Sequence, residues 1–97
     1  MGSEALRTNQ TGASNTAIGK SALRVNTASN NTAVGHNAGA SNTSGSGNVA
    51  IGKDAHDSNQ TGGENTIVGH QAAQANTSNR NTCLGNSALY SNITGYN

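Results

Sequence analysis

The sequence predicts an all-β fold, a parallel β-roll or β-solenoid in which rungs of 16–17 residues stack on one another. The first observation is a repeat: the motif Asn15-Thr16-Ala17-Ile18-Gly19 returns, with small changes, at residues 31–35, 48–52, 65–69 and 81–85. A short, nearly constant period indicates one structural unit stacked on itself. The second observation is the motif itself, because a run of apolar and β-branched residues followed by Gly is typical of a strand that ends in a turn.

The third observation is the composition. Only 31% of the 97 residues are hydrophobic, the chain has no Phe, Trp or Pro, and Asn, Thr, Ser and Gly make up about half of it. So little apolar surface would not offset the conformational entropy of a free-standing globule. A rung needs only about two or three apolar residues if its neighbours cover it above and below. Stacking is therefore what lets this chain fold.

Each rung has three positions at fixed spacing: an opening Asn, an Ala seven residues later, and a second Asn four residues after that. They are Asn15, Asn31, Asn48, Asn65 and Asn81; Ala22, Ala38, Ala55, Ala72 and Ala88; and Asn26, Asn42, Asn59, Asn76 and Asn92. All variation in rung length follows the second Asn, so this corner is expected to face solvent. The predicted rung is a strand, a tight turn, a second short strand and a loop.

The turn is assigned to a Gly that ends every motif, because such a Gly usually supplies a positive φ or a close backbone approach. These are Gly19, Gly35, Gly52, Gly69 and Gly85.

Side chains alternate across the predicted strand. One set is expected to form the core of the rung: Ile18, Val34, Ile51, Val68 and Leu84, with Thr16, Thr32, Val49, Thr66 and Thr82 on the same face. The opposite set is also small or apolar: Ala17, Ala33, Ala50, Ile67 and Cys83. A strand that is apolar on both faces is buried on both. A two-strand rung covers only one, so the second set is predicted to lie at a subunit contact in an oligomer.

The chain is organised as one repeat domain over residues 4–97, interpreted as an excerpt of a longer fibre, after Met1-Gly2-Ser3, which we interpret as an expression scar. The net charge is +1 and no basic run indicates nucleic-acid binding. No apolar stretch of about 18 residues could insert into a membrane. The single Cys83 excludes an intrachain disulfide.

Candidate functional residues form ladders rather than a pocket. Lys20, His36, Lys53 and His70 follow the turn Gly, with Asn86 in the fifth rung, and we call these four the basic stripe. The stripe could meet anionic glycans, or be a solvated turn position. The Asn ladders are expected to hydrogen-bond to the rungs above and below rather than to a ligand. No catalytic arrangement, cofactor motif or converging set of metal ligands is visible, so no enzyme activity, cofactor or metal is expected.

Two stretches resemble known repeats. Asn48-Val49-Ala50-Ile51-Gly52 followed by Ala55 resembles the N-S-V-A-I-G-x-x-S repeat of YadA-like trimeric autotransporter adhesin heads. Residues 81–95 are similar to the N-T-A-V-G-x-x-A-L-x-x-N-T-T-G repeats of phage and large-virus fibres. The resemblance covers residues 4–97, although these rungs are longer than the adhesin-head repeat. It implies a left-handed β-roll, three chains around a threefold axis, and an extracellular protein on a cell or virion surface.

The function expected from these features is a non-enzymatic structural and attachment module of a trimeric fibre or adhesin. Its partners would be two further copies of the chain and a host-surface glycan or protein receptor. The alternative is a β-solenoid that binds ice or another surface through Thr16, Thr32, Thr66 and Thr82. Two features count against it: Val49 interrupts the ladder, and the predicted alternation points these Thr inward beside Ile18.

Overall fold

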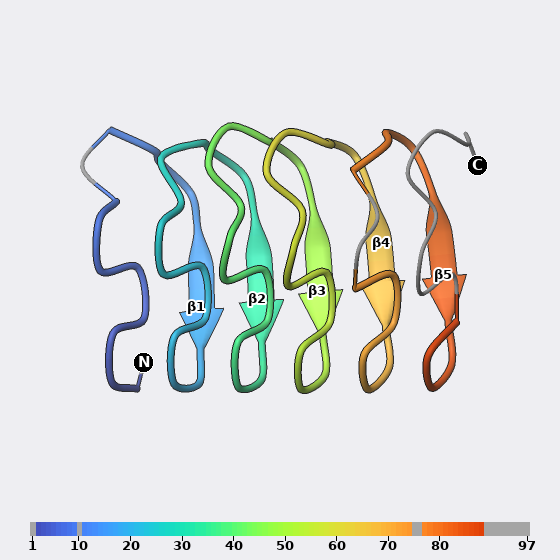
Figure 1. The fold of residues 1–97 in the computed structure, drawn as a ribbon. Helices are drawn as coiled ribbons and strands as arrows, with labels where there is room; N and C mark the ends of the chain where they lie inside the picture. Colours follow the sequence, from blue (N-terminus) through green and yellow to red (C-terminus); the bar gives the residue numbers. More distant parts are fainter. Residues whose placement is uncertain (1, 10, 75–76, 89–97) are drawn as a thin grey trace.

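The computed structural model describes residues 2–9, 11–74 and 77–88, and shows five parallel strands in one sheet. Neighbouring strands in the sheet are also neighbours in the chain (Figure 1). The strands are β1 (Thr16–Ile18), β2 (Thr32–Val34), β3 (Val49–Ile51), β4 (Thr66–Val68) and β5 (Thr82–Leu84). The prediction of an all-β parallel β-solenoid is confirmed. The predicted ladder positions Asn76 and Asn92 lie outside the described residues.

The sequence repeat and the structural repeat coincide residue by residue. Thr16 pairs with Thr32 and Ile18 with Val34, and the same register continues through the sheet to β5. The ladder extends beyond the strands, because the N–H of Gly35 donates to the carbonyl of Ile18 at 2.7 Å. Parallel strands need a long crossover connection, and here the remainder of each rung is that connection.

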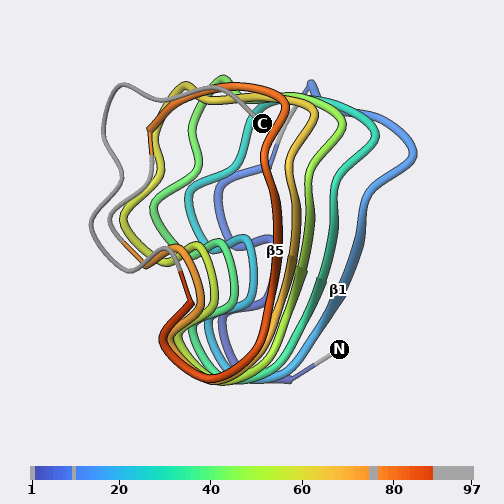
Figure 2. The ribbon, with the colours of Figure 1, turned by 90° about the vertical axis from the view of Figure 1, so that its right-hand side faces the viewer.

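The return segment after the turn differs from the prediction, because it forms consecutive turns instead of a second strand. The N–H of Ala22 donates to the carbonyl of Gly19 at 3.2 Å, and the N–H of Arg24 donates to that of Ser21 at 3.2 Å. Ser21 and Leu23 have φ values of 61° and 49°, which bend the chain instead of extending it. Figure 2, along the stack, shows the strands on one side and the bent return segments on the other.

The turn Gly is required for two reasons. Gly19 has a φ of +123°, which lies outside the range that L-residues adopt. A Cβ at Gly19 would also lie 2.7 Å from the carbonyl carbon of Gly35 in the next rung. The same clash with the backbone of the next rung recurs at Gly35, Gly52 and Gly69, so the close spacing of the stacked turns leaves no room for a side chain.

The two faces of the strands are the reverse of the prediction. The set assigned to a subunit contact is buried within the chain, at no more than 5% exposure: Ala17, Ala33, Ala50, Ile67 and Cys83. We call this set the inner ladder. The set assigned to the core lies outside: Ile18 is 48% exposed, Ile51 38% and Leu84 78%, and Val34 and Val68 are half-buried. The reason is the narrow rung, whose interior is filled by small side chains and Asn amides.

The interior is filled by size compensation between the inner ladder and the residue six positions later. Ala17 is followed by Leu23, whereas Ile67 is followed by Ala73, and all four are buried. A Cβ added at Gly39 would lie 4.0 Å from the Cβ of Ala33 and 3.0 Å from Cδ2 of Leu23. The two positions therefore face each other across the rung, and a large side chain in one rung fills space left by a small one in the next.

Candidate functional site

Two Asn side chains close each of the first three rungs at its variable corner. In the first rung, the Nδ2 groups of Asn15 and Asn26 both donate to the backbone carbonyl of Ala28, at 2.8 and 2.7 Å. Gly45 receives the same pair of bonds from Asn31 and Asn42, and Gly62 receives them from Asn48 and Asn59. We call this acceptor the closing carbonyl. It ties the first residue of a rung to its last turn.

The same Asn residues also connect successive rungs. Oδ1 of Asn15 accepts the backbone N–H of Asn31 at 2.9 Å, and Oδ1 of Asn31 accepts that of Asn48 at 2.8 Å. Asn42 donates to Oδ1 of Asn26 at 2.6 Å along the second ladder. The described ladder members after Asn15 are at most 3% exposed. The hydrogen bonds between rungs that were expected from the sequence are thus present, and these amides are structural rather than a binding surface.

The closing carbonyl also explains how the corner tolerates two lengths. Where six residues separate the two Asn ladders, the closing carbonyl belongs to the third residue, Gly45 or Gly62. Where five residues separate them, it belongs to the second residue, Ala28. A Cβ at Gly45 would lie only 2.2 Å from the carbonyl oxygen of Gly62. The longer corner therefore needs Gly at this point, and either length leaves the acceptor in the same place.

The outer face of the sheet carries the largest exposed apolar side chains among the described residues, Ile18, Ile51 and Leu84. With Val34 and Val68 they form a row that we call the outer ladder. A second row on the same face contains Thr16, Thr32, Val49, Thr66 and Thr82, which are half-buried or exposed. Both rows run the length of the described sheet, so this face presents a repeating array of methyl and hydroxyl groups.

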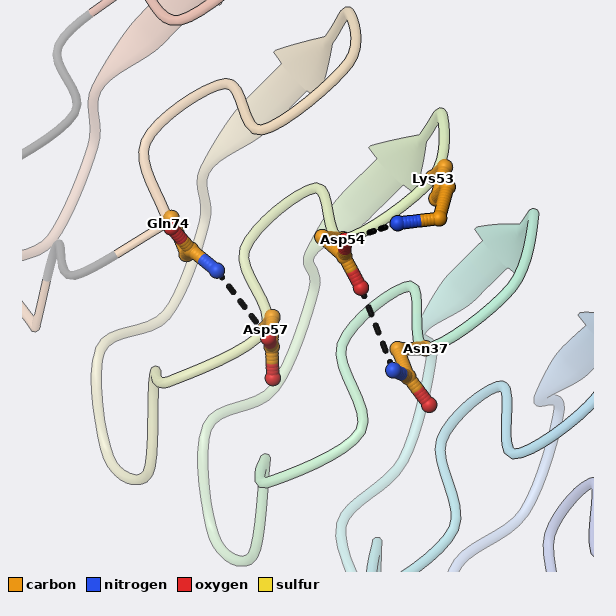
Figure 3. Close-up of polar contacts among 5 residues, drawn as sticks. All are labelled: Asn37, Lys53, Asp54, Asp57 and Gln74. Carbon is orange, nitrogen blue, oxygen red and sulfur yellow. Dashed lines mark hydrogen bonds and ion pairs between the residues drawn. The ribbon is translucent and has the colours of Figure 1, made fainter.

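The basic stripe lies at the turn end of the strands. All four of its members, Lys20, His36, Lys53 and His70, are exposed, as is Asn86. Nζ of Lys53 lies 2.6 Å from Oδ2 of Asp54, and Asn37 donates to Oδ1 of the same carboxylate at 3.1 Å (Figure 3). Burial raises the pKa of Asp54, but the bonds from Lys53 and Asn37 and the nearby charges outweigh it and hold that pKa below its ordinary value.

The three histidines do not form a metal site. His36 and His70 are exposed on the stripe, whereas His56 is 1% exposed inside the stack. Over the described ranges no group of three His, Cys, Asp or Glu side chains could hold a metal ion. No pocket is found in that part of the chain, and it contains no helix long and apolar enough to cross a membrane.

The burial of His56 is not among the features expected from the sequence. The residue directly follows the buried Ala55, at the position that Leu23 holds in the first rung and Ala73 in the fourth. This equivalence could have predicted the burial of His56, because an apolar residue at one rung position indicates that the same position is buried in the other rungs.

Comparison of the chain with protein-family models, with curated proteins and with solved structures finds no match. The case for function therefore depends on the surfaces described above.

The Asn ladders generate a stability prediction. Asn48→Ala would leave the buried N–H of Asn65 without its acceptor and remove one donor from the closing carbonyl of Gly62. We expect a loss of about 2–4 kcal/mol in the free energy of unfolding, measured by denaturant titration. The control is Asn86→Lys, at an exposed turn position where two other rungs carry Lys, and we expect it to change little. Equal effects of the two substitutions would contradict the structural role of the ladder.

Proposed function

We propose that this rung stack is a non-enzymatic structural and attachment module of an extracellular fibre on a cell or virion surface, assembled as a homotrimer. The outer ladder is the contact between copies, in place of the inner ladder that the sequence suggested. The number three is what the resemblance to adhesin heads and viral fibres implies. The basic stripe is the part of the surface that meets an anionic host glycan or protein receptor.

The observation that carries the proposal is the exposure of the outer ladder. The chain has few large aliphatic side chains, and yet Ile18, Ile51 and Leu84 are between 38% and 78% exposed. Contiguous apolar surface on a water-soluble protein is typical of an interaction site. A second copy of the same face offers a matching row of methyl groups at the same rung spacing, about 4.8 Å.

The geometry of a solenoid makes such a contact additive. Each rung adds one member to the outer ladder, so the apolar area available to a partner grows with the number of rungs. Burial of apolar surface contributes about 25 cal/mol per Å². A single strand of three residues could not hold copies together, but a row that runs along the whole stack can.

A second candidate function follows from the Thr row on the same face. One of the two features that counted against ice binding was the predicted alternation, which pointed these side chains inward. In the structure Thr16, Thr66 and Thr82 are exposed instead. A repeating array of hydroxyl and methyl groups suits an ordered water surface, although Val49 still interrupts the row. Assembly and ice binding use the same face and exclude each other.

The proposed contact is tested by a substitution on the outer face of β3. Ile51→Asp places a carboxylate on the outer face and should convert a trimer into a folded monomer, because burying an unpaired charge at a contact is unfavourable. The measurement is mass by light scattering, with circular dichroism for folding.

Two variants calibrate this result. Ser44→Asp, at the exposed corner, should remain trimeric. Ala50→Asp, whose carboxylate would lie inside the rung, should not fold. A monomeric wild-type chain, or a trimeric Ile51→Asp variant, would refute the proposed contact.

The proposed attachment surface is tested by charge removal on the stripe. The double substitution Lys20→Asn with Lys53→Asn introduces the residue that the fifth rung already has there, Asn86. It should elute from immobilised heparin at lower salt than the wild type, because fewer cations meet the polyanion. The control is Arg80→Asn, which removes one exposed cation at the opposite corner. A shift no larger than that of the control would count against the stripe.

Ice binding predicts the opposite outcome from assembly. It requires a monomer that shows thermal hysteresis of ice growth, lost in Thr66→Lys because the substitution breaks the array. The attachment function predicts no hysteresis in either protein. Hysteresis in the wild type and none in the variant would show that the outer face binds ice and is not the contact between copies.

A further inference from the structure

His56 is the one histidine placed inside the described part of the stack. It is 1% exposed and lies in the return segment between Ala55 and Asp57. Its equivalents in the neighbouring rungs are Gly39 and Ala73, and Leu23 lies one rung further on; all of these are buried and apolar. An apolar residue would serve the packing equally well, so an ionisable ring at this position introduces a property that the other rungs lack.

The groups packed around the ring favour its neutral form. Nε2 of His56 lies 3.5 Å from the Nδ2 amide of Asn65. Oδ1 of Asn65 is occupied by the backbone N–H of Asn81 at 2.8 Å, which fixes the amide with its donor side toward the imidazole. The two protons of this Nδ2 group already go to Oδ1 of Asn48 and to the backbone carbonyl of Ser78, at 3.1 and 2.9 Å, and Nδ1 of the ring is buried without a hydrogen bond. Adding a proton to the ring would set two N–H donors against each other.

No carboxylate compensates for a charge on this ring. The two acids that flank His56 in sequence are both bonded to other side chains (Figure 3). Asp54 binds Lys53 and Asn37, and Asp57 accepts a bond from Nε2 of Gln74 at 3.2 Å. Among the described residues, the backbone carbonyl of Ala73 is the neighbour that favours the charged ring, although no hydrogen bond to Nδ1 is formed. Burial lowers the pKa of His56 from 6.5 to about 4, and this carbonyl raises it only in part.

We propose that His56 makes the middle of the stack acid-labile: when its buried ring takes up a proton, the rung that opens at Asn48 separates from the rung that opens at Asn65. The contact at risk is the one that joins these rungs, since Asn65 donates to Oδ1 of Asn48 from both its backbone and its side chain, at 3.0 and 3.1 Å. A stack built this way holds its length at neutral pH and opens at one place in acid.

The direction of the pH effect follows from proton linkage. The unfolded chain binds a proton at the ordinary pKa of 6.5 and the folded chain only near 4, so acid favours the open form between these values. Stability is complete above about pH 6.5 and falls as the pH is lowered toward 4. Between pH 7.5 and pH 5 the unfolding equilibrium constant per chain should rise about 25-fold.

The test compares the full chain with His56→Leu and His36→Asn at one protein concentration, by denaturant unfolding at pH 7.5 and pH 5. His56→Leu introduces the residue of the first rung, Leu23, and should lose most of the pH dependence. His36→Asn removes an exposed histidine of the stripe and should keep it. The same pH dependence in the wild type and in His56→Leu would overturn the proposal.

Two measurements on the wild type keep the test independent of whether His56→Leu folds. The ring proton shifts of His56, followed by NMR, should stay those of the neutral form well below pH 6 while the protein remains folded. Amide exchange at pH 5, corrected for intrinsic rates, should increase first over residues 55–65 and later over residues 16–22. Titration of a folded-state His56 ring near pH 6.5, or uniform exchange along the stack, would overturn the proposal.

Discussion

Bonds from asparagine amides to the closing carbonyl hold together the first three rungs and fix the shape of the stack. Most residues of the variable corner are exposed, but the two Asn residues and the acceptor Gly of the longer corner are buried, and their polar groups need partners. Buried polar groups without partners are costly. Asn48 and Asn59 supply both partners at Gly62, and the opening Asn of the next rung takes its own partner from Oδ1 of Asn48. Side chains thus add to the backbone hydrogen bonds that join successive rungs at this corner, such as the bond from the N–H of Thr27 to the carbonyl of Thr43.

This polar closure decides what faces outward. Because amides occupy one end of the rung interior, little room remains for large apolar side chains, and the inner ladder is mostly Ala. Ile51 and Leu84 are then left on the outer face, at 38% and 78% exposure. The surface proposed for assembly is therefore a consequence of how the rung closes, and the basic stripe lies on the adjoining turn.

The repeat, the parallel register and the stacked Asn residues could be predicted, because a fixed period places equivalent residues over one another whatever the details of the rung. The facing of the strand could not be obtained from alternation, which separates two sets without saying which is inside. Which set is inside is indicated by the paired sizes of facing residues: small Ala17 is matched by large Leu23, and large Ile67 by small Ala73. The missing second strand reflects positive φ values at ordinary residues such as Ser21 and Leu23, which composition does not reveal.

The central claim, that side-chain amides act as part of the backbone ladder, is tested most directly by hydrogen exchange of the asparagine Nδ2 protons, followed by NMR. The amide protons of Asn48 and Asn59 should exchange as slowly as the backbone amides of β3, because both need the stack to open. Those of the exposed Asn30 and Asn86 should exchange at the rate of free asparagine. Fast exchange at Asn48 and Asn59, beside slow exchange in β3, would contradict the account.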